Sequence, residues 1–101
     1  KKKVATSLYE EIILSNNKIY SILALNTVIE KNLISNKKKI LEYFKILNNS
    51  ILLKEQKDLL SLKKALYLIK NSDTKNGMKL LNQLKDENLN LKPIIQEILE
   101  N

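Results

Sequence analysis

The chain nearly repeats itself, because a shift of 37 positions places one helix-turn-helix pattern over a second one. The paired positions hold similar apolar or small residues at helical spacing. They are Leu25 and Leu62, Val28 and Ala65, Ile29 and Leu66, Ser35 and Ser72, Leu41 and Met78, Phe44 and Leu81, and Leu47 and Leu84. Repeats of about 20 to 50 residues built from two helices are typical of α-solenoids, whose units bury their apolar faces against their neighbours. The repeat predicts an all-α fold, a right-handed superhelix of antiparallel helical hairpins.

The composition also favours helices. The 101 residues include one Gly, one Pro and five aromatic residues, whereas a sheet favours Val, Thr, aromatic residues and turn glycines. A chain of this length forms one domain, so we expect a single domain over residues 1–101 with about six helices. The expected helices span residues 3–14, 18–33, 37–47, 53–70 and 74–85, and the last one begins near residue 93.

Short connections between these segments favour antiparallel packing of successive helices. The predicted hairpins cover residues 18–48 and 53–85, and a capping helix at residues 90–100 closes the end of the array. The first helix is either the remaining half of an earlier repeat or a cap. The second helix is apolar over most of its length, which predicts a central position, covered on more than one side.

Polar residues mark the ends of several predicted helices. Ser35-Asn36 and Ser72-Asp73 precede the third and fifth helices at matching positions, where their side chains can accept hydrogen bonds from first-turn amides. Asn90 is predicted to cap the last helix. Gly77 lies inside the fifth helix, where Gly costs up to about 1 kcal/mol relative to Ala. We therefore expect a neighbouring helix to approach closely at Gly77.

The residue inventory excludes most enzyme chemistry. The sequence contains neither Cys nor His, and all 18 of its basic residues are Lys. It therefore has no disulfide, no thiolate or imidazole for metal binding or catalysis, and no guanidinium for bidentate phosphate binding. The carboxylate pairs Glu10-Glu11 and Asp86-Glu87 diverge by about 100° on a helix and do not share a target. We expect a protein that is not an enzyme, with no catalytic residue, metal site or cofactor.

The formal charge of +7 raises the possibility of a nucleic-acid partner. Apart from Lys1 to Lys3 and Lys37 to Lys39, however, the lysines are scattered among 11 acidic residues, whereas a nucleic-acid-binding surface gathers its charge on one face. Nucleic acid is therefore the less favoured partner. No apolar run is long enough to span a membrane, and Lys1 to Lys3 are either the flank of a preceding membrane anchor or a polar linker.

The four tyrosines lie beside apolar helix positions. The ordinary outcome for Tyr9, Tyr20, Tyr43 and Tyr67 is a buried ring whose hydroxyl reaches the rim. The alternative follows from the enrichment of tyrosine at binding hot spots, and it makes Tyr20 and Tyr67 the candidate partner-binding residues. Their spacing does not decide between these two outcomes.

Four stretches of the sequence resemble segments of a known protein family. Residues 19–28 read IYSILALNTV, residues 57–66 read KDLLSLKKAL, residues 81–84 read LNQL, and residues 91–99 read LKPIIQEIL. They resemble the tetratricopeptide-like domain of bacterial YfgM-type proteins, with its motifs Tyr-Ala-x-Leu-Ala-x-Leu and Asp-Leu-Ala-x-Leu-x-x-Ala and a final closing helix. Ser21 and Ser61 replace alanines of that pattern, and Gly77 stands where a repeat prefers alanine.

The resemblance implies a non-catalytic protein-binding domain of tetratricopeptide-like hairpins. It would face the periplasm from the inner membrane, held only by an N-terminal anchor preceding Lys1, as an ancillary protein of the SecYEG translocon linked to periplasmic chaperones. No small-molecule substrate is expected. The alternatives are a cytosolic adaptor, a small basic nucleic-acid-binding domain, and self-association through exposed helix ends.

Overall fold

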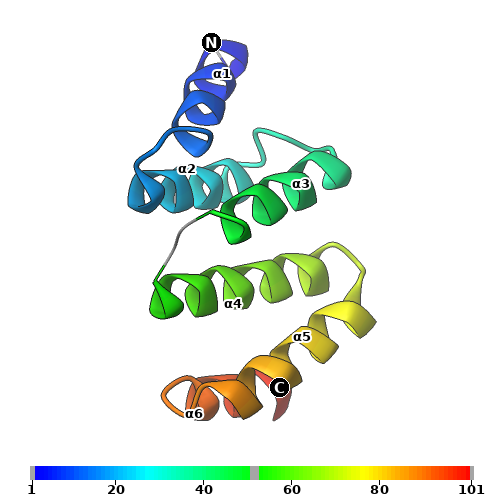
Figure 1. The fold of residues 1–101 in the computed structure, drawn as a ribbon. Helices are drawn as coiled ribbons and strands as arrows, with labels where there is room; N and C mark the ends of the chain where they lie inside the picture. The colour runs from blue at the N-terminus through cyan, green and yellow to red at the C-terminus, as the bar shows by residue number, and fades with distance from the viewer. Residues whose placement is uncertain (1, 51–52, 101) are drawn as a thin grey trace. The chain divides into compact units, whose positions relative to one another are not determined.

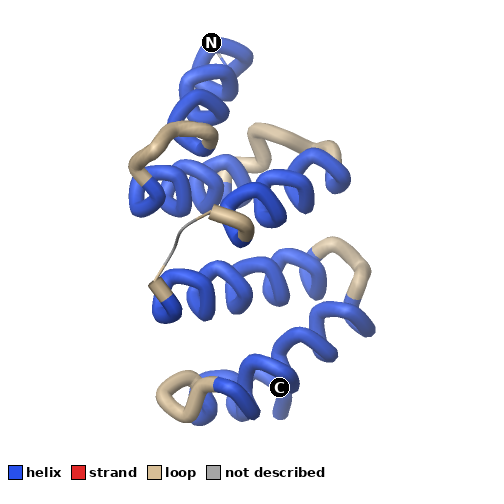
Figure 2. Tube along the Cα trace, viewed as in Figure 1, coloured by secondary structure: helices blue, strands red, loops and turns tan. Residues whose placement is uncertain are grey.

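The computed structural model describes residues 2–50 and 53–100. Within these residues the protein is all-helical, with six α-helices and no strand, so the predicted all-α class is confirmed (Figure 2). The helices are α1 (Lys2–Ile13), α2 (Lys18–Glu30), α3 (Lys37–Asn48), α4 (Lys54–Lys70), α5 (Thr74–Glu87) and α6 (Lys92–Glu100).

The helices divide into two compact units, Lys1–Leu52 with α1 to α3 and Leu53–Asn101 with α4 to α6 (Figure 1). In the first unit α2 contacts both α1 and α3. In the second unit α5 contacts both α4 and α6. Each unit therefore has one central helix. The single domain over residues 1–101 stays a prediction.

The first unit buries side chains from all three of its helices. They are Ile13 of α1, Ser21, Ile22, Ala24, Leu25 and Val28 of α2, and Ile40, Tyr43, Phe44 and Leu47 of α3. The hydroxyl of Ser21 lies 2.9 Å from the carbonyl oxygens of Ile12 and Asn17. This buried hydroxyl therefore ties the end of α1 to the beginning of α2.

A polar contact also joins α1 to α3. The hydroxyl of Tyr43 donates a hydrogen bond to the carboxylate of Glu10, and Nζ of Lys39 lies 2.8 Å from Oε2 of Glu10. The hydrogen bond from Lys39, followed by the one from Tyr43, lowers the pKa of Glu10 below its ordinary value of 4.5. Burial, followed by the bond to Glu10, raises the pKa of Tyr43.

This contact predicts a pH-dependent contribution to stability. Because the pKa of Glu10 is lowered in the folded state, its contribution is present above pH 4.5 and is lost as the pH falls below that value. We expect Glu10→Gln to lower the free energy of unfolding by about 0.5–1 kcal/mol at neutral pH and to lower it by less at about pH 3, where protonation of Glu10 has begun to remove the contribution. Urea denaturation at the two pH values measures this difference. Exposed Glu11→Gln is the control, and a loss from Glu10→Gln that is independent of pH would contradict the assignment.

The second unit has its core around α5. Ala65, Leu81, Leu84 and Ile95 form a buried cluster, and partly buried side chains of α4, α5 and α6 pack against it. Gly77 is buried in α5. A Cβ atom built on Gly77 would lie 2.6 Å from Cγ1 of Ile69 and 2.8 Å from the carbonyl oxygen of Ala65. The close approach predicted at Gly77 is therefore present, and α4 is the helix that makes it.

Positions related by the shift of 37 residues are buried in both units. Among the apolar and small residues they are Val28 and Ala65, Ile40 and Gly77, Phe44 and Leu81, and Leu47 and Leu84. In three of these pairs the second unit has the smaller residue, and the difference is largest where α2 and α3 have Val and Ile and α4 and α5 have Ala and Gly. Small residues let two helices approach closely. In agreement with this, α4 and α5 contact each other more extensively than α2 and α3 do.

Left-handed residues end the first helix of each hairpin. Asn32 has φ 52° and Ser72 has φ 70°. The amide of Leu33 bonds the carbonyl of Val28, and the amide of Asp73 bonds the carbonyl of Leu68, which is the pattern of a Schellman motif. The predicted second helix over residues 18–33 was therefore too long, because Asn32 ends it after Glu30.

One predicted cap is found and two differ. Asn36 is the N-cap residue of α3, and its side chain accepts a hydrogen bond from a first-turn amide. Asn17, which was not predicted as a cap, does the same for α2. Before α5, Ser72 belongs to the end of α4 instead, and Asp73 alone holds the N-cap position. At the start of α6, the side chain of Asn88, and not Asn90, accepts a hydrogen bond from the amide of Leu91 at 3.1 Å.

Candidate functional site

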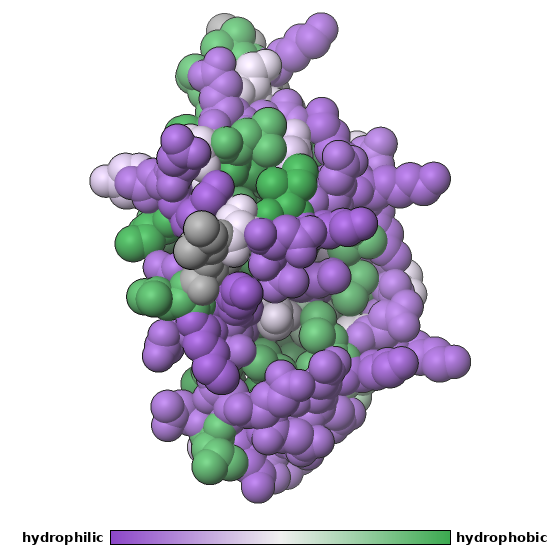
Figure 3. All heavy atoms as spheres, in the orientation of Figure 1, coloured by the Kyte–Doolittle hydropathy of each residue, from purple (hydrophilic) through white to green (hydrophobic). Residues whose placement is uncertain are grey.

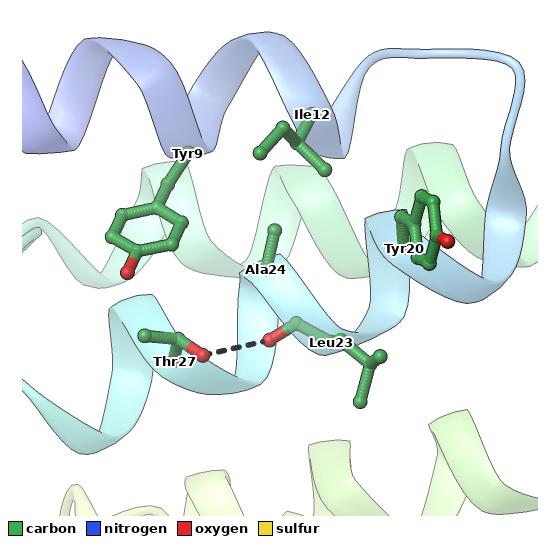
Figure 4. A pocket seen from close by; sticks show the side chains of 6 residues that line it. All are labelled: Tyr9, Ile12, Tyr20, Leu23, Ala24 and Thr27. Carbon is green, nitrogen blue, oxygen red and sulfur yellow. Dashed lines mark hydrogen bonds between the residues drawn. The ribbon is translucent and has the colours of Figure 1, made fainter.

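A hollow of about 250 Å³ lies between α1 and α2 in the first unit. Its lining consists of Tyr9 and Ile12 from α1 and Tyr20, Leu23, Ala24 and Thr27 from α2. Figure 4 shows Tyr9 and Ile12 extending from α1 toward α2, with Ala24 between the two helices. We call this hollow and its rim the α1–α2 groove.

The sequence of α2 explains why the hollow exists. Residues 19–29 contain no charged side chain, so α2 has apolar residues on the face toward α3 and on the face toward the groove. Ala24 is only 5% exposed, and its side chain is too short to fill the space below Tyr9 and Ile12. A small residue on one helix opposite larger residues on its neighbour leaves a hollow of this kind.

The rim of the groove is both apolar and exposed. Tyr20 is 61% and Leu23 57% exposed. Further large exposed apolar residues of α1, α2 and the turn between them are Val4, Leu8, Ile12, Leu14 and Ile19. Figure 3 shows hydrophobic side chains at the surface in the region of the first unit. Exposed apolar residues that gather in one place indicate an interaction surface, whereas single ones do not.

The lining of the groove offers few polar groups to an occupant. Oγ1 of Thr27 donates to the carbonyl oxygen of Leu23 at 3.0 Å (Figure 4), so the hydroxyl proton of Thr27 is already used within α2. Within residues 2–50 and 53–100, the hydroxyls of Tyr9 and Tyr20 make no hydrogen bond to the protein. An occupant would therefore meet an apolar surface with two phenolic hydroxyls.

A second hollow, of about 380 Å³, lies in the second unit and is polar. Its lining consists of Lys54, Glu55 and Asp58 of α4, and Glu87, Asn88, Leu89 and Asn90 at the α5–α6 connection. Asp58 accepts hydrogen bonds from Lys54 at 2.8 Å and from Asn88 at 2.7 Å. The bond from Lys54 lowers the pKa of Asp58 below its ordinary value. These bonds give Asp58 a structural role, holding the start of α6 near α4.

In the described part of the chain, no group of three or more acidic, His or Cys side chains could hold a metal ion. The carboxylate of Glu10 is bound by Tyr43 and Lys39. Lys39 of the basic cluster at residues 37–39 is thus already paired within the unit.

The two tyrosines proposed from the sequence lie in different surroundings. Tyr20 is at the rim of the α1–α2 groove, whereas Tyr67 is buried, at 8% exposure. Burial raises the pKa of Tyr67. Sequence reasoning did not find Tyr9, Ile12 or Ala24 as site residues. The uncharged run over residues 19–29 was the signal that could have indicated an exposed apolar face.

The fold and the groove define a class, an all-α protein of helical hairpins with an apolar surface groove. Comparison of the chain with protein-family models, with curated proteins and with solved structures finds no significant match. Among the described residues, no helix has the length and apolar character needed to cross a bilayer.

Proposed function

We propose that this chain is a non-catalytic protein-interaction module that receives its partner in the α1–α2 groove. The observation that carries the proposal is the exposure of Tyr20 and Leu23 beside a hollow whose lining is almost entirely apolar. Covering such a surface removes apolar area from water, and the free energy of this transfer is favourable by roughly 25 cal/mol per Å² of apolar area buried. The two tyrosines add rigid aromatic contact area at the same place.

A narrower assignment is part of this proposal. In this assignment the chain is a domain that faces the periplasm and is anchored in the inner membrane. It assists the SecYEG translocon together with periplasmic chaperones, and the groove binds one of these partners. Its support is the resemblance of residues 19–28, 57–66, 81–84 and 91–99 to the YfgM-type pattern. A cytosolic adaptor that uses the same groove is the alternative location.

Site-specific photocrosslinking tests the proposal. The photoreactive residue p-benzoylphenylalanine is placed at position 20, and the chain is irradiated in an extract of the cells that produce it. We expect protein adducts that decrease at least about fivefold when Ala24→Met is also present, because the Met side chain grows into the hollow while retaining good helix propensity. Mass spectrometry identifies the adducts, and translocon subunits or periplasmic chaperones among them are expected from the narrower assignment.

Position 89 supplies the matched control. Leu89 is 76% exposed and lies in the other unit, so the same photoreactive residue there should not form these adducts. The absence of protein adducts at position 20, or adducts with nucleic acid or lipid alone, would contradict the proposal. An adduct of two copies of the chain would assign the groove to self-association instead.

A further inference from the structure

We propose that Asn76 is a site of spontaneous modification, where the folded chain converts its own asparagine to aspartate and isoaspartate. The isoaspartate product weakens the contact between α4 and α5. Asn76 precedes Gly77, the one Gly of the sequence, so the chain has a single Asn-Gly pair. Both residues lie in the first turn of α5. This inference is independent of the α1–α2 groove and of its partner.

An Asn-Gly pair is reactive because the backbone nitrogen of the second residue can attack the side chain of the first. A bond forms between the nitrogen of Gly77 and Cγ of Asn76, and the bond from Cγ to Nδ2 breaks. Nδ2 leaves as ammonia with the proton from the amide of Gly77. Water then opens the five-membered imide, giving aspartate by attack at Cγ and isoaspartate by attack at the main-chain carbonyl carbon. Glycine favours ring closure because it has no Cβ to restrict the backbone.

The packing of α5 against α4 requires the second residue of this pair to be glycine. Gly77 is buried, and a Cβ atom there would lie 2.8 Å from the carbonyl oxygen of Ala65 and 3.2 Å from the amide nitrogen of Ile69. These backbone atoms of α4 cannot move away without displacing the helix. The residue that allows the close approach of the two helices is therefore also the residue that makes Asn76 reactive.

The start of α5 exposes Asn76 to water. Thr74, Lys75 and Asn76 are all exposed. The side chain of the N-cap residue Asp73 makes no capping bond to a first-turn amide, and its Oδ2 accepts a hydrogen bond from Nδ2 of Asn76 at 3.2 Å. The amide of Gly77 donates to the carbonyl oxygen of Asp73 at 3.0 Å. Attack on Cγ requires this backbone bond to open, and the first turn of a helix opens at a small cost in free energy.

The two products change the turn in different ways. Both replace a neutral amide with a carboxylate, and in aspartate an oxygen takes the place of the donor Nδ2 beside Oδ2 of Asp73, so that hydrogen bond is lost. Isoaspartate also routes the main chain through its Cβ atom, which inserts one carbon atom before Gly77. Since Gly77 lies at the close contact with Ala65, the added atom displaces α5 from α4. Isoaspartate therefore destabilises the second unit more than aspartate does.

Incubation of the folded chain in mildly alkaline buffer, followed by peptide mapping with mass spectrometry, tests the modification. We expect Asn76 to be modified at least about fivefold faster than Asn49 and Asn71, which precede serine, a residue with a Cβ atom. In urea that unfolds the chain, the rate at Asn76 should rise at least about threefold, because the first turn no longer has to open. Asn76→Gln is the matched control and should stay unmodified, since its side chain would have to close a larger ring.

A second measurement tests the effect on α4 and α5. Ion exchange separates the modified chain by its changed charge, and methylation by an isoaspartyl methyltransferase identifies the isoaspartate form. We expect this form to unfold at a lower urea concentration than the unmodified chain. Freshly purified Asn76→Asp adds the charge without the extra backbone atom and should shift the midpoint by less than about half as much. An unmodified Asn76 in the folded chain, faster modification of another asparagine, or an isoaspartate form as stable as Asn76→Asp would each overturn the inference.

Discussion

Replacing Gly77 with isoleucine, the residue type at the equivalent position 40 of the first unit, is expected to unfold the second unit. A Cβ atom at Gly77 would already lie 2.8 Å from the carbonyl oxygen of Ala65, a backbone atom that cannot move without displacing α4. Overpacking of a core typically costs about 1–3 kcal/mol, and more where backbone must shift. A branched side chain at this position should therefore cost more than about 3 kcal/mol. Chemical denaturation followed by circular dichroism measures the loss.

Lys79→Ile is the matched control for this substitution. Lys79 is exposed on the same helix, so the variant introduces the same β-branched residue without the contact to α4. Its effect should stay within about 1 kcal/mol, the range of helix propensities for ordinary residues. A Gly77→Ile protein as stable as the Lys79→Ile protein would show that the two helices do not need their close approach.

Leu81→Ala is expected to produce the second large loss of stability. Leu81 is fully buried in the cluster with Ala65, Leu84 and Ile95, so truncation removes apolar contacts and leaves a cavity. Such substitutions cost about 2–5 kcal/mol, depending on how far the surroundings relax. The midpoint of urea unfolding measures the change. Leu89→Ala, at a leucine that is 76% exposed, should change stability by no more than about 0.5 kcal/mol, and similar losses in the two variants would contradict the assigned core.

Much of the helical pattern follows from the sequence because hydrophobic spacing and cap residues act locally. The predicted starts at Lys18, Lys37 and Thr74 match the observed helices. The end of α2 was placed three residues too late because the left-handed conformation of Asn32 leaves no mark in the apolar pattern. Ser72 adopts the same conformation, which is why it ends α4 and leaves the N-cap position to Asp73.

The groove was less accessible to sequence reasoning because it is built by two helices. Tyr20 was a candidate from its residue type alone, but the hollow also needs Tyr9 and Ile12 of α1 opposite Ala24. An alanine in an apolar helix looks like an ordinary core residue. The apolar character of α2 correctly indicated a helix between two others. It did not indicate that Tyr20 and Leu23 would remain exposed.

The order of α1 and α2 along the chain has a consequence during synthesis. Residues 19–29 form an eleven-residue stretch without a charge, and such stretches aggregate when they are left uncovered in an incomplete chain. Because α1 precedes α2, it has already left the ribosome when that stretch emerges, and the tie from Ser21 to the carbonyl of Ile12 can form at once. The N-terminal helix is therefore available to cover one face of α2 before α3 has been translated.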